Sequence, residues 1–292
     1  MRLSGLRHLS FTRILYGFGI FFGIVAIAGA SALVGLPGKF QSTDIALSGS
    51  GLPLPDPKGG FDYQLGGGYT PPAGVTIVER DRTDRPSGAG YDICYVNGFQ
   101  TQPDEADAFL KAHPDLILKS GNTPIEDPEW DNEFLFNTST PEKRAGLLAV
   151  VGPWIQGCKT AGFAAVEIDN LDSYTRSKGL LNQDTNVAMA TEYAKVAHAA
   201  GLAIAQKNST ELAPRLSAGG FDFAISESCF YYKECGAFTG NYPVVLDIEY
   251  TNELGTKKFP AACTTAGRPG VMIMRDLDLV RPGDKGYYYK RC

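Results

Sequence analysis

Short apolar segments alternate with amphipathic helical stretches from residue 61 onward, and this alternation limits the possible folds more than any other feature of the chain. Strands that alternate with helices are parallel and are joined by right-handed crossovers. Two stretches, 141–162 and 185–201, have the length and periodicity of helices. The segments with strand character are FDYQL (61–65), VTIVERD (75–81), DICYVNG (92–98), DLILKSG (115–121), FAAVEID (163–169), GLAIAQK (201–207), FDFAISES (221–228), PVVLDIEY (243–250) and VMIMRDLDL (271–279).

This pattern predicts a (β/α)8 TIM-type barrel, because about 230 residues with eight or nine strands have the size of that fold. A doubly wound open sheet is the alternative, and it usually carries a glycine-rich phosphate-binding turn. The glycine triplet at 66–68 does not have the GxGxxG spacing. A barrel of this class has eight strands, whereas the sequence has nine candidates. The barrel positions of 61–65 and 75–81 are therefore left open.

The chain begins with a basic stretch followed by an apolar run. The basic stretch has three arginines and no acid, and the apolar run has no charged residue. About 20 apolar residues cross a bilayer, and flanking arginines stay in the cytoplasm. We expect a single-pass type II membrane protein with an extracellular catalytic domain. Its predicted parts are a cytoplasmic tail (1–13), a transmembrane signal-anchor (14–36), a flexible linker rich in Ser, Gly and Pro (37–60) and a catalytic barrel (61–292).

Export of the chain governs the interpretation of its six cysteines. A signal peptide cleaved near Ala28, Ala30 or Ala32 is the alternative to the anchor, and it exports the chain as well. The sequons at Asn137 and Asn208 agree with export. An even number of cysteines in an oxidising compartment indicates disulfides, whereas zinc would need CxxC spacing or a nearby histidine, so we expect neither a metal nor another cofactor. The expected pairs are Cys229 with Cys235, Cys263 with Cys292, and Cys94 with Cys158.

The charge balance restricts the class of partner. The formal net charge is −5, but every charged residue in the first 39 is basic, so the exported part holds 23 basic and 32 acidic residues. An acidic protein is unsuited to nucleic acid, which needs a basic surface, and it suits a cationic or neutral ligand. The chain also has no HExxH, GxSxG or Walker sequence, which disfavours zinc hydrolases, serine hydrolases and nucleotide hydrolases.

Acids, amides and a lysine gather at the carboxyl ends of several predicted strands. In a barrel these ends meet at one mouth, where catalytic residues lie. Within VEIDNLDSYTRS (166–177), side chains alternate between the two faces of the strand. With Val166 and Ile168 facing the helices, Glu167 and Asp169 face the barrel axis, and Asp169 is nearer the mouth.

A purely structural interpretation of these acids also exists. Asp169 and Asp172 can cap the following helix or pair with Arg176, as loop acids commonly do. For Asp172 the two interpretations are equally supported. For Asp169 we favour function, because burying two adjacent carboxylates is costly unless the protein uses them.

A pair of carboxylates indicates glycoside hydrolysis. One carboxylate stays ionised and attacks or stabilises the oxocarbenium-like centre, while the other holds a proton for the leaving oxygen. The partner of Asp169 is open between Glu227, Asp247 and Glu249 at this point. Glu227 shares its strand face with Phe223 and Ile225, whereas Asp247 and Glu249 share a face with each other.

Several sequence blocks together resemble the endo-α-1,4-polygalactosaminidases of glycoside hydrolase family 114. The resemblance spans residues 61 to about 280, and it implies a (β/α)8 barrel that cuts galactosamine-containing polymers, such as the galactosaminogalactan of fungal walls and biofilms, with retention at the anomeric carbon. The blocks are DYQLGGGY (62–69), ERDR (79–82), ICYVNGFQTQ (93–102), VEIDNLDSYTRS (166–177), AHAAGLAIAQKN (197–208) and ISESC (225–229).

The resemblance also implies roles for individual residues. Asp169 matches the nucleophile of the family and Glu227 its general acid/base, which selects one of the three partners left open above. The expected partner is a cationic, galactosamine-rich polysaccharide. Alternatives are another α-glycan or α-galactan hydrolase on the same barrel, or a surface carbohydrate-binding protein without catalysis. The implied substrate contacts are Asp62, Gln64, Tyr174, Lys207, Asn208 and Glu249.

Overall fold

The computed structural model describes residues 48–292. The predicted cytoplasmic tail, the transmembrane segment and the first eleven residues of the predicted linker (37–47) therefore lie outside the described residues. Within residues 48–292, no helix combines the length and the apolar character needed to cross a bilayer.

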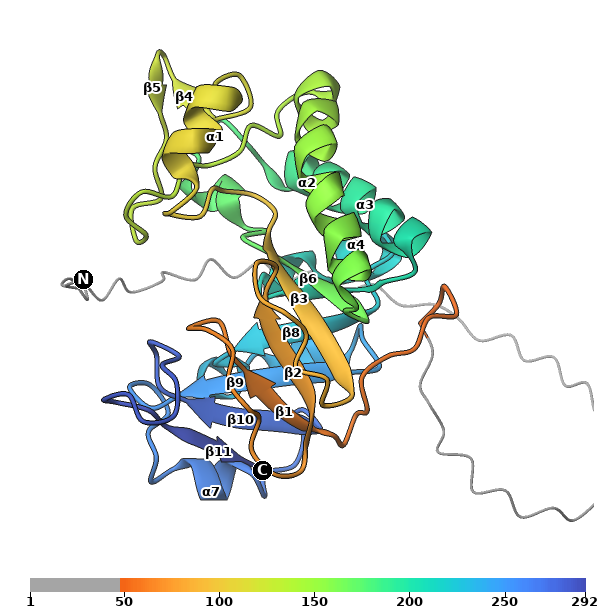
Figure 1. The fold of residues 1–292 in the computed structure, drawn as a ribbon, viewed down its shortest axis with the longest axis vertical. Coiled ribbons are helices and arrows are strands. Elements are labelled where there is room, and N and C mark those ends of the chain that lie inside the picture. Colours follow the sequence, from red (N-terminus) through yellow and green to blue (C-terminus); the bar gives the residue numbers. More distant parts are fainter. Residues whose placement is uncertain (1–47) are drawn as a thin grey trace, which may run out of the picture. The chain divides into compact units, whose positions relative to one another are not determined.

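A nine-stranded sheet forms the centre of this part and curls into a nearly closed barrel (Figure 1). Eight strands are parallel and follow one another around the sheet in sequence order, and β11 pairs antiparallel with β10. The mixed α/β, barrel-like fold expected from the alternation is confirmed. The strands of the sheet are β1 (Gly60–Tyr63), β2 (Val75–Asp81), β3 (Tyr91–Asn97), β6 (Ala165–Asp169), β7 (Ala203–Lys207), β8 (Phe223–Glu227), β9 (Val245–Tyr250), β10 (Val271–Arg275) and β11 (Tyr289–Arg291).

Eight of the predicted strand segments lie in this sheet, including the two whose places were left open, and the prediction for 115–121 was wrong. The backbone of that segment pairs with a later loop instead, as in the bond of 2.8 Å from Leu118 N to the carbonyl oxygen of Leu135. Two of its residues form β4 (Lys119–Ser120), which makes a separate hairpin with β5 (Thr123–Pro124). The apolar run 115–121 therefore lies outside the main sheet, in which β3 pairs directly with β6.

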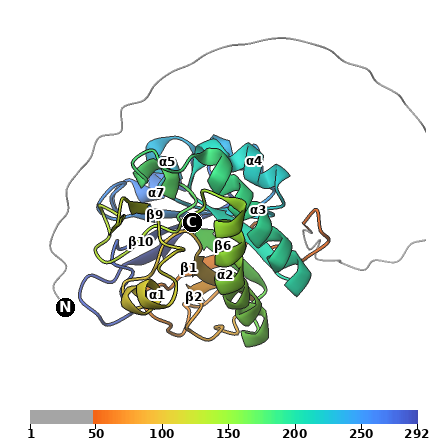
Figure 2. The same ribbon diagram turned by 90° about the horizontal axis from the view of Figure 1, so that it is seen from above.

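Helices cover the sheet unevenly (Figure 2). The two predicted helices are confirmed as α2 (Pro141–Ala161) and α3 (Gln183–Ala200), which pack against each other. In the described chain, the connections from β1 to β2 and from β2 to β3 contain no helix, so the alternation is less regular than expected. The other helices are α1 (Ala106–Ala112), η1 (Ser173–Arg176), η2 (Thr210–Leu212), α4 (Ala213–Ala218), α5 (Cys229–Tyr232), α6 (Cys235–Thr239) and α7 (Phe259–Ala262).

Local sequence sets the ends of the two long helices. The hydroxyl of Thr140 accepts a hydrogen bond of 3.3 Å from Lys143 N at the start of α2, and Asn182 forms a capping box at the start of α3. Both helices end at a glycine with left-handed backbone, Gly162 (φ 106°) and Gly201 (φ 75°). These caps hold the two helices that pack on the outer face of β6.

The two faces of β6 differ as the alternation predicted. Val166 and Ile168 pack in one core cluster with Val151 of α2 and Tyr193 of α3, so they lie on the outer face. Glu167, on the opposite face, is fully buried within the barrel.

The interior of the barrel is apolar below and charged above. Its apolar layers, toward the amino ends of the strands, include Ala165, Ala203, Phe223 and Ile225 in one buried cluster. Phe223 and Ile225 precede Glu227 on the same face of β8, so the apolar neighbours of Glu227 mark the inner face rather than the outer one. Acidic and basic side chains follow only at the carboxyl ends of these strands.

A buried arginine joins the two ends of the parallel run, where β1 lies beside β10. Arg275 of β10 is fully buried, and its Nη1 donates to Asp62 Oδ1 at 3.2 Å and to the carbonyl oxygen of Tyr63. Tyr289 of β11 donates its hydroxyl to the carbonyl oxygen of Phe61 at 2.8 Å. Side chains therefore close the barrel where its backbone ladder ends.

Three disulfides join all six cysteines in the expected pairs. They connect β3 to α2, close the loop between α5 and α6, and tie the last residue to the end of α7. In the described part of the chain, the one cluster of metal-ligating residue types combines Cys229 and Cys235 with Asp247, and the disulfide uses both sulfur atoms. The pairs are Cys94–Cys158, Cys229–Cys235 and Cys263–Cys292.

Replacing Arg275 by alanine tests whether it closes the barrel. We expect R275A to lower the free energy of unfolding by about 3–5 kcal/mol, because Asp62 is left buried without its cation. Urea denaturation measures this loss. The control is Arg281→Ala, which removes an arginine that is 58% exposed, and we expect a change of less than about 0.5 kcal/mol. Equal effects of the two substitutions would show that Arg275 does not stabilise the barrel.

Candidate active site

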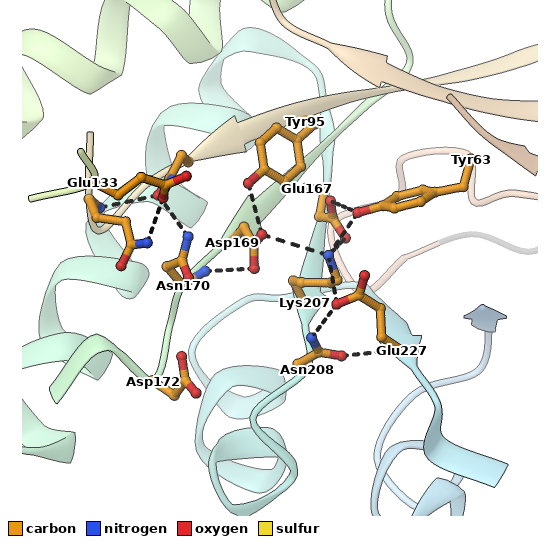
Figure 3. Close-up of polar contacts among 12 residues, drawn as sticks. Tyr63, Tyr95, Glu133, Glu167, Asp169, Asn170, Asp172, Lys207, Asn208 and Glu227 are labelled. Atoms are coloured by element: carbon orange, nitrogen blue, oxygen red, sulfur yellow. Dashed lines mark hydrogen bonds and ion pairs between the residues drawn. The ribbon is translucent and has the colours of Figure 1, made fainter. Parts of the chain in front are cut away.

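A single buried ammonium group lies at the mouth of the barrel (Figure 3). Lys207, the last residue of β7, has a side chain only 2% exposed, and its Nζ donates to the Tyr63 hydroxyl at 2.7 Å. The same nitrogen lies 3.8 Å from Glu167 Oε1, 3.7 Å from Asp169 Oδ2 and 3.4 Å from Glu227 Oε2. Asp169, Glu227 and Lys207, all singled out from the sequence, are therefore together in space.

Each oxygen of Asp169 has its own donor. The Tyr95 hydroxyl donates to Oδ2 at 2.8 Å, and the backbone N–H of Asn170 donates to Oδ1 at 2.7 Å. With Lys207 beside Oδ2 as well, this environment suits a negatively charged carboxylate in a fixed orientation.

Glu227 is held from the neighbouring strands β7 and β9. Its Oε2 accepts from Asn208 Nδ2 at 2.9 Å, its backbone N–H donates to Asn208 Oδ1 at 2.8 Å, and its Oε1 accepts from the Tyr250 hydroxyl. Asn208 Nδ2 is also the atom that N-glycosylation modifies, so a glycan on it would lie beside the Glu227 carboxylate. Because Glu227 and Asp169 contact one lysine nitrogen, their nearest oxygens are no farther apart than the sum of those two contact distances.

The backbone turns sharply just after each of the three strands that carry these acids and the lysine. Asn170, Asn208 and Ser228 directly follow β6, β7 and β8, and all three have left-handed backbone, with φ of 62°, 47° and 57°. Left-handed residues other than glycine are uncommon, although asparagine tolerates this conformation, and strained positions cluster at functional sites. The turns leave the last side chain of each strand directed into the mouth.

A second pair of acids lies beneath Lys207. Glu79 of β2 is fully buried, and neither of its oxygens accepts a hydrogen bond from the described residues. Burial and the neighbouring charge of Glu167 raise the pKa of Glu79 well above its usual range. Burial also raises the pKa of Glu167 to about 7, although Lys207 opposes this shift.

The charge of Lys207 is retained despite burial. Burial alone would lower its pKa, but the negative charges of Asp169, Glu167 and Glu227 outweigh burial and raise that pKa well above the usual value. The site therefore contains one permanent cation among several carboxyl groups.

Asp62 and Gln64, two of the implied substrate contacts, lie away from this group. Both are fully buried, Asp62 on β1 and Gln64 directly after it, and Gln64 Nε2 donates to Asp62 Oδ2 at 2.8 Å. Asp62 also binds Arg275, and Gln64 Oε1 accepts from Arg80 Nε at 3.0 Å. Tyr63, between them in sequence, is the residue of β1 that reaches Lys207.

Glu249 also lies elsewhere, on the outer face of β9. Its Oε1 accepts from the backbone N–H groups of Phe230 and Tyr231 at 2.9 and 3.3 Å, at the start of α5. Asp247 lies on the same face and accepts from the Ser226 hydroxyl at 2.9 Å. These two acids fasten the loop that follows Glu227 rather than facing the mouth.

The loop after β6 contains the remaining candidates. The Tyr174 hydroxyl donates to Glu211 and accepts from Gln183 Nε2 at 3.3 Å. Asp172 pairs with Arg176 at 3.0 Å, as the structural interpretation of that residue expects.

Sequence reasoning missed another acid, which lies on the far side of Asp169 from Glu227 (Figure 3). Glu133, in the loop between β5 and α2, is 9% exposed and accepts hydrogen bonds from Gln100 and Asn97. Burial raises its pKa to about 7, the Gln100 hydrogen bond opposes this, and the charges of Asp169 and Asp127 add to it. No strand pattern marks this loop position, and the sequence therefore gave no reason to select it.

Comparison with protein families identifies this arrangement. The model of the glycoside-hydrolase family GH114 matches residues 45–292. The chain belongs to family GH114. It is therefore a glycoside hydrolase, in agreement with the two carboxylates at its barrel mouth. No curated protein sequence matched the chain.

Solved structures support the fold of this GH114 chain. Aspergillus fumigatus Ega3, crystallised in complex with galactosamine, superimposes with a TM-score of 0.63 at 20% identity, over 82% of this chain and 96% of that one. The glycoside hydrolase domain of PelA from Pseudomonas aeruginosa gives a TM-score of 0.50 at 14% identity, over 75% of this chain and 95% of that one. At these identities the likeness concerns the fold.

Proposed function

We propose that this GH114 enzyme is a retaining endo-glycosidase that cleaves α-1,4-linked, galactosamine-containing polysaccharide. Asp169 is the nucleophile and Glu227 the general acid/base in this proposal. The observation that carries it is the contact of both carboxylates with the Lys207 ammonium at the mouth of the barrel. Galactosamine bound to a structure of the same fold supports the choice of sugar.

In the first step, a carboxylate oxygen of Asp169 attacks the anomeric carbon while the bond from that carbon to the leaving sugar oxygen breaks. Glu227 gives its proton to the leaving oxygen. In the second step, Glu227 takes a proton from water, the water oxygen attacks the anomeric carbon, and the bond to Asp169 breaks. Two inversions give net retention.

Lys207, Tyr95 and Asn208 position these two acids in the proposed mechanism. Lys207 and the Tyr95 hydroxyl hold Asp169, and the Asn208 amide holds Glu227. Among the implied substrate contacts, we keep Lys207 and Asn208, which contact the two acids, and Tyr174, which lies in the loop after β6. The buried positions of Asp62 and Gln64 and the outward position of Glu249 support structural roles for those three.

We further assign the sheet to the (β/α)8 class and the domain to the cell exterior, as a membrane-anchored or secreted enzyme. The eight parallel strands in sequence order support the first assignment, and the three disulfides support the second. The acidic balance of the exported part suits a polymer that carries ammonium groups.

Substitution of the two acids tests their roles. We expect D169N and E227Q each to lower the rate of cleavage of defined galactosamine oligomers by roughly 10²- to 10⁴-fold, because each removes a group that exchanges charge or a proton with the reacting bond. Cleavage is measured by mass spectrometry of the oligosaccharide products that a protein comprising residues 48–292 releases. Glu192→Gln, which neutralises an exposed acid on α3, is the control and should cleave normally. Full activity of D169N would rule out Asp169 as the nucleophile.

The configuration of the first product tests retention. We expect the α anomer to appear first in proton NMR spectra and to equilibrate later, because a covalent intermediate on Asp169 inverts the centre twice. Initial release of the β anomer would contradict the proposal and would indicate direct attack by water.

A further inference from the structure

Glu133 is a buried carboxylate with one oxygen held by the protein and one left free. Its Oε2 accepts from Gln100 Nε2 at 2.6 Å and from Asn97 Nδ2 at 3.3 Å. Its Oε1 accepts no hydrogen bond from the described residues and is not among the side-chain atoms closed off from solvent. Asp169 lies between Glu133 and Glu227 in Figure 3, so Glu133 is on the Asp169 side of the site.

The two amides that hold Glu133 are oriented by a cation that does not touch it. Arg176 Nη2 donates to Gln100 Oε1 at 3.4 Å, so the Gln100 nitrogen is directed at Glu133. The same Nη2 donates to Asn170 Oδ1 at 3.1 Å, and Asn170 Nδ2 donates to Asn97 Oδ1 at 3.1 Å, which leaves the Asn97 nitrogen for Glu133. Both chains of hydrogen bonds end on Glu133 Oε2, and they hold it as an acceptor.

The loop that carries Glu133 is fixed at its base and exposes an aromatic ring. Asp127 pairs with Arg176 at 2.7 Å, and its backbone N–H donates to the Glu133 carbonyl oxygen at 2.7 Å. Trp130, whose carbonyl oxygen accepts from Glu133 N, is 60% exposed. An exposed aromatic side chain in the same loop as a fixed carboxylate is a combination that suits an amino sugar, which has an apolar ring face and a cation.

The negative charge of Glu133 has no cationic partner among the described residues. Among the described residues it forms no ion pair, while the carboxylates of Asp127 and Asp169 both act on it and raise its pKa. Arg176 is already paired with Asp127 and Asp172. A cation placed at Glu133 Oε1 would therefore meet an acceptor that no protein cation satisfies.

We propose that Glu133 binds the ammonium group of the galactosamine residue whose anomeric carbon Asp169 attacks, and so selects a free amine over an acetamide at that sugar. This inference rests on the proposed function. The amine of galactosamine is on C2, next to the reacting carbon, and positive charge there opposes the oxocarbenium-like transition state. A carboxylate beside the ammonium offsets that charge, so Glu133 sets both binding and rate for the deacetylated sugar.

The experiment uses a randomly half-acetylated α-1,4-galactosamine polymer and sequences the products by mass spectrometry. The sugar attacked by Asp169 becomes the new reducing end, so its acetylation reports directly on this position. We expect wild-type products to be enriched in free amine at the new reducing end, and E133Q to reduce that enrichment roughly 10- to 100-fold, as the loss of a charged hydrogen bond implies. Glu133→Gln keeps one acceptor oxygen for Gln100 and Asn97, and Glu133→Asp should keep the preference in part.

The control is Glu129→Gln, which removes the same charge from an exposed position of the same loop and should leave the enrichment unchanged. Unchanged enrichment in E133Q, with normal cleavage, would overturn the proposed role of Glu133 and would leave the proposed function standing. Loss of cleavage of every substrate by E133Q, with an unaltered melting temperature, would instead place Glu133 in the reaction itself and would also overturn it. Absence of any product from the wild-type protein would overturn the proposed function and this inference with it.

Discussion

The Lys207 ammonium, within 4 Å of three carboxylates, is the interaction on which the rest of the site depends. Two like charges 4 Å apart repel by about 4 kcal/mol at the effective dielectric constant of a protein. A cation between Glu167, Asp169 and Glu227 offsets this repulsion. Burial and the charge of Glu167 raise the pKa of a further acid, Glu79, well above its usual range. The Lys207 ammonium thus offsets negative charge in a buried, acid-rich site.

The barrel places these groups and keeps them still. Apolar layers fill its lower interior, so that the polar side chains begin only at the carboxyl ends of β6, β7 and β8. Left-handed residues then turn the chain away from the mouth. On the outer face of β9, Asp247 and Glu249 hold the loop after Glu227. The buried Arg275 joins β10 to β1. Residues far from the reaction in this way fix the positions of Asp169 and Glu227.

The sequence predicted most of the fold because strand and helix periodicities are local properties. Eight strands, both long helices and the inward direction of Glu167 and Asp169 followed from alternation alone. The segment 115–121 failed because an apolar run does not reveal whether its backbone partner is a sheet or a loop. Asp62, Gln64 and Glu249 were assigned by motif, and the face of the strand that each occupies depends on register. Glu133 comes from an irregular loop, and only the folded chain brings it beside Asp169.

The most direct test of the central role of Lys207 is the free energy of unfolding of Lys207→Met and wild-type protein, measured by urea denaturation at pH 5 and pH 8. Burial raises the pKa of Glu167 to about 7 and Lys207 opposes this shift, so removal of the ammonium raises that folded-state pKa further above its unfolded value. Stability that Glu167 provides when protonated is then lost as the pH rises through the folded-state pKa. The gap between the two proteins should therefore widen by about 2 kcal/mol or more at pH 8, while Lys195→Met, an exposed control, should show no such change. An equal gap at both pH values would contradict the account.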